Sequence, residues 1–183
     1  MKNGLPLAVP GMRIGLFGGS FDPAHEGHRH VAETALKRLG LDRVWWLVTP
    51  QNPLKPKSSS LKKRVASARK QARGPKMVVT DIEARLGCGY TYETLRQLKA
   101  LYPGVRFTLV MGADNLANFQ QWKNWEEVAE AIPIAIVSRP GFGPRERLNA
   151  PKHWIFLAAR HHPQASSAIR AAKRPAVAKP PRK

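Results

Sequence analysis

The sequence predicts a single α/β domain of the Rossmann-like, doubly wound type, with a mainly parallel sheet covered by helices on both faces. Short apolar runs alternate along the chain with segments of helical periodicity, an order typical of parallel sheets. The first apolar run ends in glycines, at residues 18 and 19. The chain has 183 residues, which is enough for one domain with a core of its own.

Several apolar runs have the length and composition of buried strands. They lie at residues 12–17, 43–48, 76–82, 105–111, 132–138 and 153–158. We assign Trp45 and Trp46, which belong to the second run, to the core.

Helical periodicity fills the intervals between these runs. The segment 25–39 repeats apolar residues at helical spacing and ends before Gly40, a common helix terminator. Further helices are expected at residues 61–72, 92–101, 113–119 and 124–132. Ser60 and Thr91 occupy the expected N-cap positions of the first two of these.

We divide the chain into three parts. Residues 1–11 form an N-terminal extension, residues 12–170 the folded domain, and residues 171–183 a basic, proline-rich tail. The tail has no apolar pattern, so we expect it to be disordered. The N-terminus does not resemble a signal peptide, no run is long enough to span a membrane, and a single cysteine fits a reducing compartment. We therefore expect a cytoplasmic protein.

The formal net charge of +19 indicates a polyanionic partner. Nine Lys or Arg and no acid lie between Lys55 and Lys76, and six more lie between Arg170 and Lys183. Neither stretch contains aromatic residues that could stack on bases, so nucleic acid is the secondary interpretation. Such runs are more often solvated faces.

Ligands of doubly wound sheets bind beyond the carboxyl ends of the strands. This rule brings together three loops, at residues 18–25, 49–57 and 112–122. The first loop opens the stretch GGSFDPAHEGHRH, residues 18–30, which contains three histidines. We expect the chemistry of the protein to be located there.

The histidines allow three interpretations. A zinc site would need a ligand from elsewhere, because His25 and His28 share a helix face while His30 points away. Plain surface histidines would leave the preceding glycines unexplained. A phosphate site explains the whole stretch, because glycines let the backbone approach an anion and a helix N-terminus attracts it. His25 and His28 can then donate hydrogen bonds to phosphate oxygens.

The stretch GLFGGSFDPAHEGH resembles the first signature of the HxGH nucleotidylyltransferases, with residues 25–28 as the HxGH motif. ASSAIR, residues 165–170, resembles their second signature, ISSTxIR. Within this superfamily, further stretches resemble the bacterial nicotinate-mononucleotide adenylyltransferases. They are GYTYETL (89–95), GADNLANFQQW (112–122) and IVSRPG (136–141), in the order of the family.

The chain also departs from the family pattern. The second signature keeps Ser166, Ile169 and Arg170, but its leading residues differ and Ser167 replaces a threonine. The hydroxyl group at position 167 is retained and allows a contact with phosphate. The family often has His-Lys where this chain has Leu54-Lys55, and it tends to continue into a C-terminal helix that the proline-rich tail cannot form.

The resemblance implies transfer of the adenylyl group of ATP to nicotinate mononucleotide, which yields nicotinate adenine dinucleotide and pyrophosphate for NAD biosynthesis. The phosphate of the mononucleotide is already a nucleophile at neutral pH, so the protein supplies alignment and positive charge rather than a base. Mg²⁺ is the implied cofactor, held on the triphosphate mostly by phosphates and water, and no metal ligands are assigned to the protein.

The resemblance also implies roles for individual residues. The ATP site comprises Gly18, Gly19, Ser20, Phe21, His25, His28, Gly112, Asp114, Ser166, Ser167 and Arg170, of which His25, His28 and Arg170 are the catalytic residues. The mononucleotide site comprises Lys55, Tyr90, Thr91, Trp122 and Arg139. In this assignment Trp122 stacks on the nicotinate ring. The simpler assignments are core packing for Trp122, an N-cap for Asp114 and a surface charge for Arg139.

Two other functions fit parts of the sequence. The first is an adenylyltransferase with another phosphorylated acceptor, such as phosphopantetheine. The second is a non-enzymatic basic protein that binds nucleic acid. The implied partners remain ATP and nicotinate mononucleotide, without a membrane or a specific nucleic acid, and a homo-oligomer is compatible with the sequence.

Overall fold

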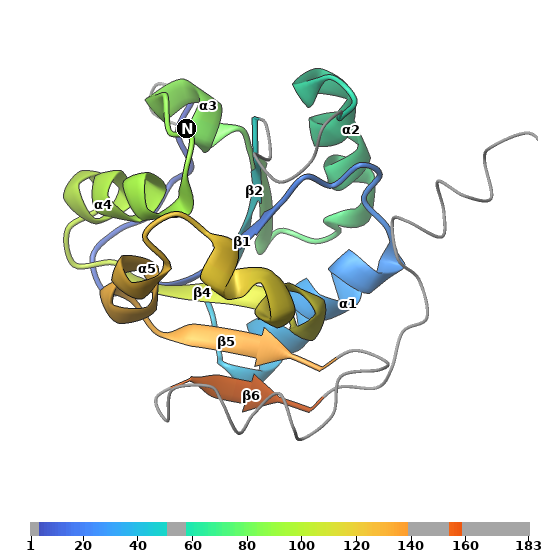
Figure 1. The fold of residues 1–183 in the computed structure, drawn as a ribbon. Coiled ribbons are helices and arrows are strands. Elements are labelled where there is room, and N and C mark those ends of the chain that lie inside the picture. Colours follow the sequence, from blue (N-terminus) through green and yellow to red (C-terminus); the bar gives the residue numbers. More distant parts are fainter. Residues whose placement is uncertain (1–3, 51–57, 139–153, 159–183) are drawn as a thin grey trace, which may run out of the picture.

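Six parallel strands form one twisted sheet with the order β3-β2-β1-β4-β5-β6 (Figure 1). The computed structural model describes residues 4–50, 58–138 and 154–158. The strands are β1 (Arg13–Gly19), β2 (Arg43–Val48), β3 (Met77–Thr80), β4 (Arg106–Gly112), β5 (Ile134–Val137) and β6 (Ile155–Leu157). The helices are α1 (Glu26–Arg38), α2 (Leu61–Gln71), α3 (Ile82–Leu86), α4 (Thr91–Leu101), the 3₁₀ helix η1 (Ala113–Gln121) and α5 (Trp125–Ala131).

The strand order makes this a doubly wound sheet. The chain builds outward from β1 through β2 to β3, then returns to the other side of β1 with β4 and continues to β5 and β6. The order therefore reverses between β1 and β4, and such a switch point opens a crevice at the carboxyl ends of the strands. The predicted fold class is confirmed, and the crevice lies where the predicted loops begin.

Two hydrophobic cores, one on each face of the sheet, hold the layers together. One core contains apolar residues of α3, α4, η1 and α5, and the other contains those of α1 and α2. Alternation along a strand sends neighbouring side chains to opposite faces. Trp45 therefore belongs to the first core and Trp46 to the second, and both are fully buried, as predicted.

The boundaries of some elements differ from the sequence prediction. The predicted strand 76–82 ends at Thr80, because Ile82 already starts α3, a helix that the sequence analysis did not find. This short helix ends at Gly87, whose φ of +67° is the left-handed conformation that glycine adopts most easily. The predicted helix 113–119 is a 3₁₀ helix that continues to Gln121.

The two predicted N-caps have different outcomes. Ser60 is the N-cap of α2, although its side chain makes no capping hydrogen bond within the described residues. Thr91 is not an N-cap, because it is the first residue of α4 and Tyr90 precedes the helix in extended conformation. Among the described residues, no helix is long and apolar enough to cross a membrane.

Candidate active site

The carboxyl ends of β1, β2 and β4 lie side by side at the switch point. Gly19 pairs with Val48 of β2, and Phe17 pairs with Val110 of β4 two residues before that strand ends. Beyond β2, the Thr49 amide donates a hydrogen bond to the Gly19 carbonyl oxygen at 3.1 Å. The described parts of the three predicted loops therefore leave the sheet at one edge.

The loop after β1 combines open space above its glycine with a buried aromatic anchor. A methyl group placed on Gly18 would meet no atom within 4 Å. Phe21 has φ of +49°, an uncommon conformation for a residue with a side chain, and its ring is 2% exposed. That ring contacts Phe17 at 5.4 Å and Trp46 at 5.1 Å between centroids. Aromatic packing thus holds the strained backbone of this loop in place.

His25 and His28 form the N-terminus of α1, in the positions predicted for phosphate binding. His25 is the N-cap, is 3% exposed, and accepts the Gly27 amide at its Nδ1 at 3.1 Å. His28 accepts the His25 amide at its Nδ1 at 3.2 Å. The two rings lie 3.9 Å apart, and the His28 ring also packs against Phe21 at 5.0 Å.

These hydrogen bonds determine which nitrogen of each ring can donate. An Nδ1 that accepts an amide proton carries none itself, so the proton of the neutral imidazole lies on Nε2. Both histidines therefore have an Nε2–H donor suited to an anion at the helix N-terminus. Within the described residues, no group of three His, Cys, Asp or Glu side chains is placed to hold a metal ion.

The loop after β4 starts with Gly112 and continues into η1. Gly112 is buried and is the N-cap of η1, while Asp114 lies in the first turn of that helix. Asp114 is therefore not the helix N-cap that was the simpler assignment. Because Gly112 ends the strand beside β1, both residues lie at the same edge of the sheet as the glycine loop.

The start of α4 meets the end of η1. The Lys123 ammonium group lies 4.5 Å from the centroid of the Tyr90 ring, a cation–π contact. Trp122, the residue before it, is half-buried and packs against Phe119 at 5.3 Å. The structure thus brings together the segments of Tyr90, Thr91 and Trp122, the predicted mononucleotide-binding residues that it describes.

Glu93 caps the N-terminus of α4. Its Oε2 accepts the amides of Gly89 and Tyr90 at 2.9 and 3.2 Å. These hydrogen bonds lower the pKa of the Glu93 carboxyl group, and the one from Gly89 has the largest effect. The amides of Thr91 and Tyr92 have no hydrogen-bond acceptor within the described residues. Only part of this helix N-terminus, the amides of Thr91 and Tyr92, is therefore open to a ligand.

Glu83, which the sequence analysis missed, is a buried carboxyl group that contacts Thr94 of α4 and Thr49 after β2. It is 7% exposed, and its Oε1 accepts a hydrogen bond from Thr94 Oγ1 at 3.2 Å. Burial raises its pKa to about 7, although the Thr49 and Thr94 hydroxyl groups oppose this shift. No sequence signal pointed to it, because the turn into α3 was assigned to a strand.

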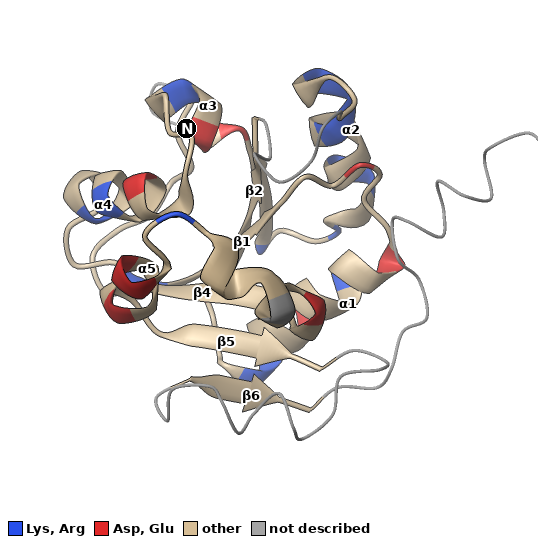
Figure 2. Ribbon diagram, viewed as in Figure 1, with Lys and Arg blue, Asp and Glu red and all other residues tan. Residues whose placement is uncertain are grey.

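The basic stretch 55–76 is not a uniform solvated face. Figure 2 shows Lys and Arg along α2, and most of them are exposed. Arg64 is the exception, since it is 2% exposed and its guanidinium group donates to carbonyl oxygens of the glycine loop and of the residues after β2. The expectation of solvated charge is therefore wrong at this position.

Some predicted site residues and segments lie outside the described residues. They are Lys55, Arg139, Ser166, Ser167 and Arg170, together with most of the loop 49–57 and the tail 171–183. Their assignments stay predictions.

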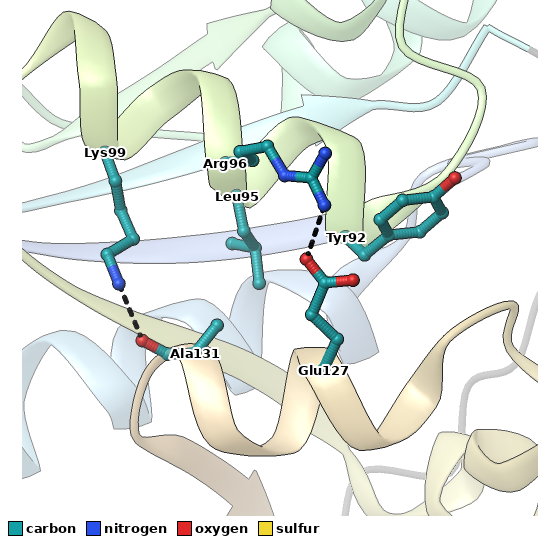
Figure 3. A pocket seen from close by; sticks show the side chains of 6 residues that line it. All are labelled: Tyr92, Leu95, Arg96, Lys99, Glu127 and Ala131. Atoms are coloured by element: carbon teal, nitrogen blue, oxygen red, sulfur yellow. Dashed lines mark hydrogen bonds and ion pairs between the residues drawn. The ribbon is translucent and has the colours of Figure 1, made fainter.

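A surface pocket lies between α4 and α5 (Figure 3). An ion pair of 3.0 Å between Arg96 and Glu127 spans it, and Lys99 donates to the Ala131 carbonyl oxygen at 3.3 Å. It contains no predicted site residue. The side chains that line it already join the two helices to each other, so we assign it a packing role.

Comparison with known proteins agrees with the geometry. The Cytidylyltransferase-like family matches residues 16–172. A probable nicotinate-nucleotide adenylyltransferase of Roseobacter denitrificans is 50% identical over 96% of this chain and 88% of its own. The corresponding protein of Cereibacter sphaeroides (strain ATCC 17025) is 54% identical over 81% of this chain and 80% of its own.

A solved structure has the same fold. It is a Plasmodium falciparum nicotinic acid mononucleotide adenylyltransferase complexed with NaAD, with a TM-score of 0.71 at 18% identity. The alignment covers 87% of this chain and 83% of that one. With the glycine loop and the HxGH motif at the switch point and about half of the sequence shared with these bacterial relatives, the chain belongs to the Cytidylyltransferase-like family and, within it, to the nicotinate-nucleotide adenylyltransferases.

Proposed function

We infer that the chain transfers the adenylyl group of ATP to nicotinate mononucleotide, producing nicotinate adenine dinucleotide and pyrophosphate in NAD biosynthesis. The observation that carries the inference is the pair of imidazole rings, 3.9 Å apart, at the helix N-terminus that follows the glycine loop. It supplies directed donors for a triphosphate at the switch point. The acceptor follows from the membership of the nicotinate-nucleotide adenylyltransferases.

In this reaction an oxygen of the mononucleotide phosphate attacks the α-phosphorus of ATP. The bond from that phosphorus to the β-phosphate bridging oxygen breaks, and pyrophosphate leaves with the electron pair. No proton has to be removed from the nucleophile. The protein therefore acts by aligning two polyanions and stabilising the charge that develops on the leaving group.

We propose that His25 and His28 bind the phosphates of ATP through Nε2–H. The backbone of the loop from Gly18 to Phe21 faces the same phosphates. Gly112 and Asp114 bind the nucleotide from the neighbouring strand end. Beyond the described residues, Ser166, Ser167 and Arg170 complete the phosphate site.

Thr91 and Trp122 bind the nicotinate ring and its carboxylate, together with Tyr90. Lys55 and Arg139, which lie outside the described residues, balance the phosphate charge of the mononucleotide. ATP enters as its Mg²⁺ complex, in which phosphates and water provide most of the metal ligands. We place this reaction in the cytoplasm, the compartment expected from the sequence.

Pyrophosphate release from MgATP tests this function. The purified chain should release pyrophosphate with nicotinate mononucleotide, and much less with nicotinamide mononucleotide or 4′-phosphopantetheine at the same concentration. Mass spectrometry should detect nicotinate adenine dinucleotide in the first reaction only. Equal or faster release with phosphopantetheine would reassign the acceptor, and release without any acceptor would indicate ATP hydrolysis.

A further inference from the structure

Arg64 lies one turn into α2 and is the one arginine or lysine of that helix whose side chain is buried in the described structure. Four neighbours in the same basic stretch point to solvent, namely Lys62, Lys63, Arg69 and Lys70. A buried guanidinium group must be hydrogen-bonded or paired, because leaving water is costly for a charge. Its partners therefore indicate what it does.

The guanidinium group binds carbonyl oxygens from three separate segments. Its Nη1 donates to the carbonyl oxygen of Ser20 at 3.0 Å and to that of Thr49, after β2, at 2.6 Å. Ser20 belongs to the glycine loop, residues 18–25, which is called the phosphate loop from here on. Its Nη2 donates to the Pro50 carbonyl oxygen at 2.6 Å, and its Nε to that of Ser59 at 2.8 Å. One side chain thus ties the phosphate loop to the β2–α2 connection and to the start of α2.

Two further hydrogen bonds join α2 and its N-terminal flank to the phosphate loop. Ser67 Oγ accepts the Ala24 amide at 2.9 Å, and Asp22 Oδ2 accepts the Ser59 amide at 2.9 Å. Burial lowers the pKa of the Arg64 guanidinium group, and the nearby Asp22 carboxylate partly opposes this shift. Asp22 and Arg64, which have opposite charges, therefore both connect the phosphate loop to α2 and the residues before it.

The contact with Ser20 has a consequence for the ligand side of the loop. In a trans peptide the carbonyl group of one residue and the amide N–H of the next point in opposite directions. Because the Ser20 carbonyl group points at Arg64, the N–H of Phe21 points away from it. Phe21 also has the uncommon φ of +49°, so this peptide orientation needs support.

We propose that Arg64 is a positioning residue that aims the Phe21 amide at the phosphates of ATP and fixes the phosphate loop against the connection after β2. The inference rests on the proposed function for the identity of the ligand. It assigns Arg64 no contact with substrate. Its effect passes through the four carbonyl oxygens that it binds.

Binding of α,β-methylene-ATP, measured by titration calorimetry with Mg²⁺, tests the proposal without requiring turnover. Arg64→Lys keeps the charge but loses the planar fork that reaches several carbonyl groups. We expect its Kd for the analogue to rise at least tenfold and its kcat to fall about 10²-fold, the loss expected when reacting groups are misplaced. Arg69→Lys is the matched control, because Arg69 is exposed on the same helix, and it should stay within twofold of wild type.

A purely structural role would lower the thermal stability of Arg64→Lys and leave Kd and kcat unchanged at temperatures where the variant is folded. That result would overturn the proposal. A second measurement uses the wild type alone, so it does not depend on folding of a variant. The Phe21 amide should become protected from hydrogen exchange when the analogue binds, and an unprotected amide would also overturn the proposal.

The two inferences fail in different ways. If the chain binds the analogue with the Arg64 dependence described above but releases no pyrophosphate with nicotinate mononucleotide, the positioning role stands and the proposed acceptor is wrong. If pyrophosphate is released normally by Arg64→Lys, the proposed function stands and the positioning role is wrong.

Discussion

The backbone amide of His25 donates a hydrogen bond to Nδ1 of His28 at 3.2 Å, so the second histidine of the HxGH motif binds back to the first. This contact gives His28 two separable functions. Nδ1 satisfies an amide at the start of α1, and Nε2 remains the donating nitrogen. A substitution that keeps an acceptor at the Nδ1 position and removes the donor at Nε2 can therefore separate helix stability from catalysis.

His28→Asn should place its Oδ1 acceptor near the Nδ1 position and lose the donor at Nε2. We expect kcat to fall by about 10²–10³-fold, the usual cost of one lost donor to developing charge, with little change in melting temperature. His28→Ala should lose the same activity and also destabilise the helix start by about 1 kcal/mol. Steady-state kinetics and thermal denaturation check both expectations, and a near-normal kcat in either variant would refute the phosphate-binding role.

Gly15 and Gly18 should respond to alanine in opposite ways. A methyl group on Gly15 would lie 2.7 Å from Leu41 Cδ1 and 3.2 Å from Val110 Cγ2, so Gly15→Ala should cost about 1–3 kcal/mol of unfolding free energy. A methyl group on Gly18 would meet no protein atom within 4 Å, so Gly18→Ala should leave stability unchanged. Denaturant unfolding of both variants measures the contrast.

Gly18→Ala should nevertheless raise the KM for ATP, because the added methyl group lies where the backbone is expected to approach phosphate. An unchanged KM would place the nucleotide away from this glycine. Gly15→Ala serves as the control here, since its methyl group faces the core and should leave the KM of the folded protein unaltered.

The buried carboxyl group of Glu83 should make stability depend on pH. Its pKa rises from 4.5 to about 7 on folding, so the folded state holds the proton more tightly than the unfolded state. The contribution is fully present below about pH 4.5 and is lost as pH rises through about 7. At about 1.4 kcal/mol for each pKa unit, the loss amounts to about 3 kcal/mol.

Glu83→Gln should remove this part of the pH dependence, because the amide group does not titrate in this range. Denaturant unfolding of the variant and of wild type should be measured at a series of pH values from 4 to 8, the range in which the carboxyl group titrates. Parallel curves for the two proteins would show that Glu83 ionises normally in the folded state.

The enzyme should prefer nicotinate mononucleotide over the nicotinamide form by at least about 10²-fold in kcat/KM, or about 2.7 kcal/mol. The Thr91 amide at the start of α4 is a candidate donor to the carboxylate, whereas an amide ligand would bring donors of its own. Thr91→Pro removes this amide donor and the Thr91 hydroxyl group, and it leaves every charge in place. Competition between the two mononucleotides measures the ratio.

The structure makes Thr91→Pro a conservative test. Proline is favoured at the first residue of a helix, and Tyr90 already has the extended conformation, φ −134° and ψ 153°, that precedes proline. The folded variant should lose much of the discrimination. Undiminished discrimination would assign the preference to nearby positive charge, for which Lys123 beside Tyr90 is a candidate among the described residues.

Local patterns determined the fold class and the central part of the site. Runs of apolar residues predicted the positions of the strands, since burial on both faces leaves a continuous apolar signature in the sequence. The glycine loop and His25 to His28 are neighbours in the chain, so their arrangement follows from a strand, a turn and a helix N-terminus. Both histidines accordingly lie where the sequence predicted.

Tertiary packing alone decided the roles of Arg64 and Glu83. In the sequence Arg64 is one of several cations in a basic stretch, and only the docking of α2 beneath the phosphate loop buries it against four carbonyl oxygens. Glu83 becomes a carboxyl group of raised pKa only because folding buries it, and the hydroxyl groups of Thr49 and Thr94 reduce this shift. The sequence alone does not show whether a charged side chain is buried or which groups it binds. Both depend on residues that are distant along the chain and come together only in the folded protein.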